Sequence, residues 1–79
     1  ERAVVEVEQA KRLNPEDITV LRKCVLVYEI SGRRARALQA FNDYLEAGGP
    51  AEELKINPDL AEMMADPEVQ ALMKSQRRP

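Results

Sequence analysis

Apolar residues recur at steps of three and four along most of this chain, which is the spacing of one face of an α-helix. Three long segments follow this pattern, and residues that stop or cap helices separate them. Asn14 and Pro15 interrupt the first, Ser31 and Gly32 end the second, and Gly48-Gly49-Pro50 ends the third. The pattern therefore predicts helices over residues 1–13, 16–30 and 33–47.

The segment after Pro50 carries a shorter pattern that repeats after nine residues. Each copy places a capping side chain before a proline and an acid, as in Asn57-Pro58-Asp59-Leu60 and Asp66-Pro67-Glu68-Val69. A cap, a fixed φ and an acid near the positive end of the helix dipole all favour a helix start. We expect two short helices over residues 58–65 and 67–76, a further turn over 51–54, and a frayed basic tail over 77–79.

A second periodicity links the first and third helices. Four positions recur 34 residues later with similar residue types, so that Ala3, Val7, Ala10 and Leu13 match Ala37, Phe41, Tyr44 and Ala47. A period of this length is typical of helical repeats that stack on copies of themselves. We expect Ala3 and Ala37 to lie where two helices approach closely, and Val7 and Phe41 to occupy like pockets of successive layers.

These positions resemble the tetratricopeptide repeat, a 34-residue helix-turn-helix unit. The resemblance is carried by Leu21, Cys24, Val25, Tyr28, Gly32, Ala37 and Phe41, which stand at the family's spacings. It covers residues 1–49 and implies an all-α fold of about one and a half antiparallel helix-turn-helix repeats, followed by a short helical cap over residues 50–79. It also implies a protein-interaction scaffold whose groove takes a peptide or a partner helix.

The chain resembles the second helix of one repeat followed by one whole repeat. In this family the first helix of each repeat lines the concave groove, and in this chain that helix is the one over residues 16–30. The resemblance therefore implies partner-binding positions on the second helix, namely Thr19, Arg22, Lys23, Leu26, Glu29 and Ile30. Arg22 and Lys23 could hold an acidic group of the partner, because charge-assisted bonds to carboxylates are strong. The alternative is that these are ordinary solvated helix residues. Of the basic residues with which co-chaperone repeats hold a terminal carboxylate, only Lys23 has a counterpart here.

The segment after Pro50 resembles the aspartate-proline-rich helical domains of stress-inducible co-chaperones. That resemblance implies an apolar groove for client segments, and binding of heat-shock chaperone tails by the repeats. The groove residues would be Leu60, Met63, Met64, Val69, Leu72 and Met73. The alternative is a cap that buries these side chains on Tyr44 and Leu45. The bulky Tyr44 at the position matching Ala10 favours the cap, because an array end needs a cover.

The amino-acid composition limits the kinds of functional site that we expect in this chain. The 79 residues include no His and a single Cys, so neither a zinc site nor an internal disulfide is expected. No nucleophile accompanies the carboxylates, and we expect no catalytic residue, no cofactor and no enzymatic activity. The acidic stretch over residues 38–73 argues against nucleic acid, and no apolar run reaches the roughly 20 residues of a membrane span. Cys24 should be buried, and the lone thiol suggests a cytoplasmic setting.

Self-association is the alternative function. About three repeats are normally needed for a stable stack, and the missing start Met suggests a piece of a longer chain. The face of the first helix formed by Val4, Val7 and Ala10 should then lack a partner helix. We expect it to seek a second copy, giving a homo-oligomer, or an upstream part of the chain.

Overall fold

The computed structural model describes residues 2–75, and within this range the fold is all-α. The helices run along the chain as α1 (Arg2–Leu13), α2 (Ile18–Ile30), α3 (Arg34–Glu46), α4 (Ala51–Lys55), the 3-10 helix η1 (Pro58–Leu60), α5 (Ala61–Met64) and α6 (Pro67–Ser75). The three long helices and α6 lie where the hydrophobic pattern predicts them. The expected helix over 58–65 is divided at Leu60, and the expected tail over 77–79 lies outside the described residues.

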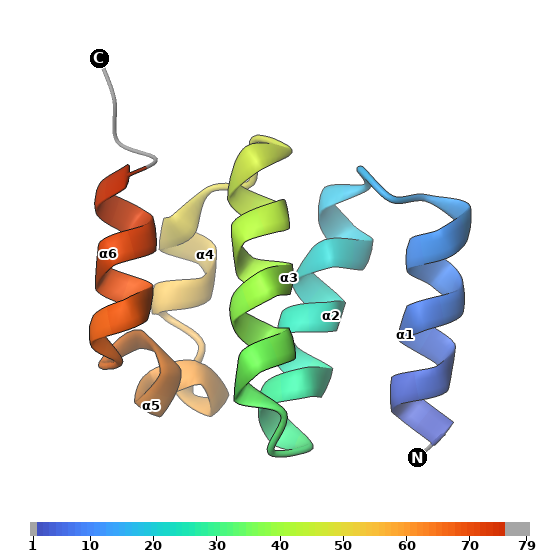
Figure 1. The fold of residues 1–79 in the computed structure, drawn as a ribbon, viewed down its shortest axis with the longest axis horizontal. Helices are drawn as coiled ribbons and strands as arrows, with labels where there is room; N and C mark the ends of the chain where they lie inside the picture. Colours follow the sequence, from blue (N-terminus) through green and yellow to red (C-terminus); the bar gives the residue numbers. More distant parts are fainter. Residues whose placement is uncertain (1, 76–79) are drawn as a thin grey trace.

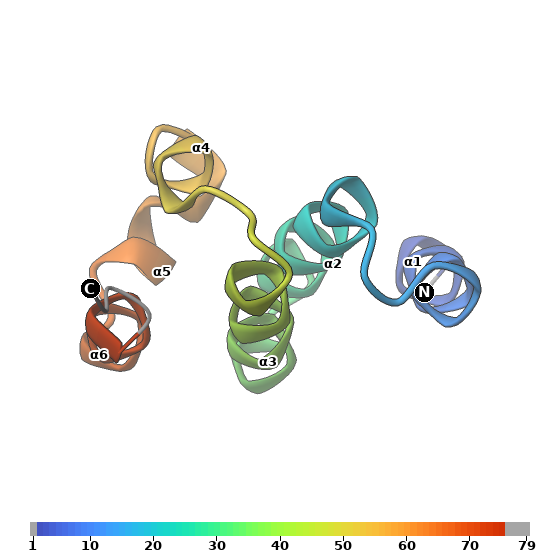
Figure 2. The same cartoon turned by 90° about the horizontal axis from the view of Figure 1, so that it is seen from above.

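The helices form two rows. Seen from above, α1, α3 and α6 lie in one row, and α2 and α4 lie in the other (Figure 2). The chain crosses between the rows at each turn, so α2 runs antiparallel to both α1 and α3 (Figure 1). Helix α2 packs on α1 and on α3, while α6 packs on α3 and η1 packs on α2. The segment after Pro50 therefore continues the two-row arrangement with shorter helices.

Local signals in the sequence fix where α2 and α3 begin and end. Asp17 caps α2 because its side chain accepts hydrogen bonds from the backbone N–H of Thr19 and Val20. Gly32 follows α2 with a φ of 76°, and Gly48 follows α3 with a φ of 95°. Both helices thus stop at a residue in the left-handed conformation that glycine adopts without steric cost.

One apolar core runs through the whole described chain. It contains residues from both sides of the expected boundary at residue 50, namely Val4, Val7, Leu21, Cys24, Val25, Tyr28, Ala37, Ala40, Phe41, Tyr44, Leu54, Leu60, Met63, Val69 and Met73. The rings of Phe41 and Tyr44 stack with centroids 6.4 Å apart. No polar or charged residue of the described range is buried. Hydrophobic burial therefore joins the segment after Pro50 to the three long helices.

Two expectations about α1 are wrong. Ala37 is buried as expected, but Ala3 is exposed, because in the described structure no helix packs on its side of α1. Val4 and Val7, expected to lie on a face that lacks a partner helix, are buried, and Ala10 is partly buried. The apolar stripe of α1 thus packs on α2 and contributes to the chain's own core.

The longest helices of the described chain have only 13 residues. None is both long and apolar enough to span a bilayer.

Candidate protein-binding surface

Helix α2 has one buried side and one open side. Leu21, Cys24, Val25 and Tyr28 enter the core. On the opposite side Thr19, Lys23, Leu26 and Ile30 follow at steps of four, three and four residues, which places them on one stripe. Thr19, Lys23 and Ile30 are exposed, and Leu26 is partly buried. We call these four residues the inner stripe.

The other two predicted binding residues bond within the molecule. Arg22 Nη1 lies 2.8 Å from Glu53 Oε1, so this guanidinium joins α2 to α4. The side chain of Glu29 is only 10% exposed, and both its oxygens accept hydrogen bonds from Arg34, at 2.7 Å each. The structure thus separates the six predicted residues into an inner stripe of four and a flanking pair that holds neighbouring elements.

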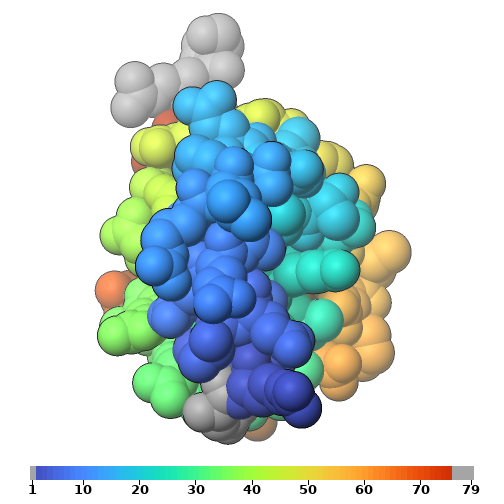
Figure 3. Space-filling model, turned by 90° about the vertical axis from the view of Figure 1, so that its right-hand side faces the viewer, coloured from blue at the N-terminus to red at the C-terminus, as the bar shows by residue number. Residues whose placement is uncertain are grey.

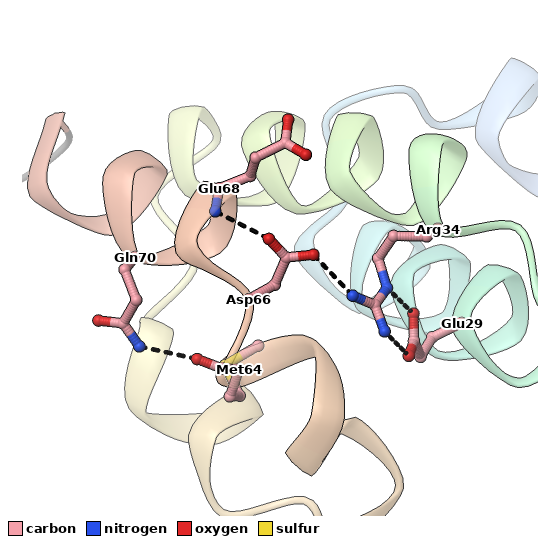
Figure 4. Close-up of polar contacts among 6 residues, drawn as sticks. All are labelled: Glu29, Arg34, Met64, Asp66, Glu68 and Gln70. Atoms are coloured by element: carbon pink, nitrogen blue, oxygen red, sulfur yellow. Dashed lines mark hydrogen bonds and ion pairs between the residues drawn. The ribbon is translucent and has the colours of Figure 1, made fainter.

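Arg34 connects three helices (Figure 4). Its Nε and Nη2 bind Glu29 at the end of α2, and its Nη1 lies 2.7 Å from Asp66 Oδ2. The other oxygen of Asp66 accepts the backbone N–H of Glu68 and so caps α6. The hydrogen bonds to Glu29 are the main cause that raises the pKa of Arg34. One guanidinium therefore fixes the start of α6 against the turn between α2 and α3.

The predicted groove residues of the segment after Pro50 are largely buried. Leu60, Met63 and Val69 are fully buried, Met73 is buried, and Met64 and Leu72 are partly buried. Tyr44 is also fully buried, and its hydroxyl donates a 2.8 Å hydrogen bond to the Pro50 carbonyl. In this conformation the predicted groove residues lie largely in the contact between the segment after Pro50 and the long helices.

Cys24 lies in the core, and its Sγ donates to the Val7 carbonyl at 3.7 Å. Burial raises the pKa of this thiol, so it stays protonated and is a poor nucleophile. The neighbouring Tyr28 donates its hydroxyl to Glu8 Oε2 at 2.8 Å. Among residues 2–75 no group of three His, Cys, Asp or Glu side chains is placed to hold a metal ion.

Sequence reasoning missed a set of ion pairs between successive layers. Lys11 binds Asp43 and Arg36 binds Glu8 across the α1–α3 side, each at 2.8 Å. These partners are 32 and 28 residues apart, and the Arg22–Glu53 and Arg34–Asp66 pairs are 31 and 32 apart. Opposite charges separated by slightly less than the 34-residue period are the sequence signal that could have located them.

Comparisons of the chain with protein-family models, with curated proteins and with solved structures gave no match.

Proposed function

We propose that this chain is a tetratricopeptide-like interaction module that binds a peptide or a partner helix along the inner stripe of α2. The observation that carries the proposal is the two-sided character of α2. One side packs between α1 and α3, and the other presents an aligned hydroxyl, base and two aliphatic side chains. The two-row arrangement and the sequence period of 34 support the repeat assignment.

The chemistry of the inner stripe suits a partner with one aliphatic anchor and one acid. Ile30 is 64% exposed and offers apolar surface at one end of the stripe. Lys23 is exposed near the other end, and no ion pair engages it among the described residues. Contacts of this kind bind by shape and by a charge-assisted bond and require no chemical step.

The test begins with a displayed library of 12-residue peptides selected on the immobilised chain. Selected peptides are then titrated calorimetrically against the double variant Lys23→Glu/Ile30→Ser. We expect affinity to fall at least about tenfold, corresponding to about 1.4 kcal/mol, with unchanged helicity, because both side chains are exposed. The matched control is Leu13→Ser/Lys74→Glu, which replaces an exposed aliphatic residue and a base elsewhere. Equal binding to the two variants would refute the inner stripe.

A co-chaperone role rests on the resemblance of the cap and on Lys23 alone. The burial of Leu60, Met63 and Val69 supports a cap, because a client could reach these side chains only if the core opened. Binding of heat-shock chaperone tails stays a prediction, and the same titration with tail peptides tests it.

A further inference from the structure

In the row α1–α3–α6, the two pairs of neighbouring helices differ in the ion pairs that cross between them. Between α1 and α3, Lys11 and Arg36 form ion pairs with Asp43 and Glu8 across the surface. Between α3 and α6 lies a groove of about 690 Å³, and among residues 2–75 the ion pair that joins its two helices is Arg34–Asp66, near the starts of both. Ala35, Leu38, Ala71 and Leu72 supply its apolar lining.

One acid lines this groove, and a second stands one helical turn beyond its lining on α3, where it also borders the hollow beside Lys11 and Asp43. Glu68 lines it at the first turn of α6, and Glu46, the last residue of α3, is hydrogen-bonded to the lining residue Asn42. No base of residues 2–75 forms an ion pair with either carboxylate. Helices α3 and α6 run in the same direction (Figure 1), and the Arg34–Asp66 bond brings their starts to one level. At 1.5 Å per residue, the two acids are then about 15 Å apart along the groove.

The outward side of α1 carries the complementary pattern. Arg2, Val5, Gln9 and Arg12 are all exposed and follow at steps of three, four and three residues, so they form one stripe. Arg2 and Arg12 are ten residues apart, which is about 15 Å along a helix. Arg2 makes only an exposed 3.8 Å pair with Glu6, and Arg12 has no ion pair within the described range. Figure 3 shows α1, in blue, on the surface at this end of the molecule.

We propose that the outward stripe of α1 in one copy of the chain docks into the α3–α6 groove of a second copy. Each base then meets one of the two acids, and Val5 meets the apolar lining between them. Because both ends of the stripe are basic and both of these groove positions are acidic, the charges match in either direction of the helix. The two surfaces are different patches, so the contact is head-to-tail and leaves one of each open at the ends of an assembly.

The test is sedimentation equilibrium of the chain at low salt between about 10 µM and 1 mM, a range that detects weak pairing. We expect the average mass to rise with concentration, and the rise to weaken at about 0.5 M salt, where surface charges are screened. The groove variant Glu46→Lys/Glu68→Lys and the helix variant Arg2→Glu/Arg12→Glu should each stay monomeric, because each juxtaposes like charges. A mixture of the two variants should associate again, because each then meets an opposite charge.

The charge-matched control is Asp59→Lys/Glu62→Lys, which reverses two exposed acids away from the groove and should associate like the original chain. Amide shifts that change with concentration should fall on α1, α3 and α6. A chain that stays monomeric at about 1 mM, variants that associate unchanged, or shifts confined to the inner stripe of α2 would each overturn the proposal. The variant Lys23→Glu/Ile30→Ser, which changes the inner stripe of α2, should self-associate like the original chain. Peptide binding and self-association therefore test the two surfaces separately.

Discussion

A β-carbon at Gly49 would stand 2.5 Å from Cε1 and Cζ of the Tyr44 ring. The ring itself is fully buried and its hydroxyl is bound to Pro50, so it cannot move away without disturbing the packing of α3 on the segment after Pro50. Gly49 is therefore required for close packing. Gly48, in contrast, is required for its left-handed backbone conformation and would meet no atom with a β-carbon.

From this contact we predict that Gly49→Ala destabilises the protein by about 1 to 3 kcal/mol, the usual cost of overpacking a core. Chemical denaturation followed by circular dichroism measures the change. In the background of Tyr44→Leu, which removes the ring, the same substitution should cost much less. Equal costs in the two backgrounds would show that the ring is not the obstacle.

A second prediction concerns the two alanines that the 34-residue period equates. Ala37→Glu places a carboxylate in the packed interior and should cost about 3 kcal/mol or more, a large part of the stability of so small a domain. Ala3→Glu is the matched control and should shift the melting temperature little, because Ala3 is exposed. Thermal melts of both variants check this, and similar losses would contradict the difference in burial.

A third prediction concerns Arg34. Arg34→Met leaves the nearly buried Glu29 carboxylate without its two hydrogen bonds and removes the bond to Asp66, so we expect a loss of about 2 kcal/mol. Hydrogen exchange should accelerate most in α6, whose cap residue loses its partner. Arg36→Met is the control, because its single bond to Glu8 is on the exposed surface and should contribute less than about 1 kcal/mol. Uniform acceleration across all helices would argue against a local role in holding α6.

A fourth prediction is a loss of stability in alkali. Burial, and then the hydrogen bond to Glu8, raises the pKa of Tyr28 from 10.0 to about 12. The unfolded chain therefore releases this proton at lower pH than the folded chain. The contribution of Tyr28 to stability is fully present below pH 10 and is lost as the pH rises from about 10 to 12, at a cost of at most about 2 to 3 kcal/mol. Burial also raises the pKa of Cys24 and Tyr44, so both add to the loss.

Urea unfolding at a series of pH values from 8 to about 12 measures this dependence. Tyr28→Phe should flatten part of the profile, because the phenol that titrates is gone. A variant profile as steep as that of the original chain would assign the loss to other groups.

Local pattern was sufficient to predict the all-α class and the positions of the long helices. Helix positions followed from apolar spacing, and the stops followed from glycines and caps whose hydrogen bonds form within a few residues, as at Asp17, Asn57 and Asp66. The division of the helix expected over 58–65 was missed, because its backbone changes from a 3-10 turn to an α-helix at Leu60 under a capping pattern that fits either.

The proposed binding surface was less predictable. The sequence shows which stripe of α2 lies opposite the core. It does not show that Arg22 and Glu29 form ion pairs, because tertiary packing brings their partners Glu53 and Arg34 to them. The exposure of Ala3 was missed for a related reason. A repeat pattern equates Ala3 with Ala37, whereas burial depends on whether another helix lies beside each of them.

Helices α1 and α2 each pack on the next helix along the chain. The loops that must close for these contacts to form are short, so little chain entropy is lost before each contact stabilises the structure. The molecule can therefore assemble layer by layer from one α-helical hairpin, and we expect rapid folding with few opportunities for mispaired intermediates.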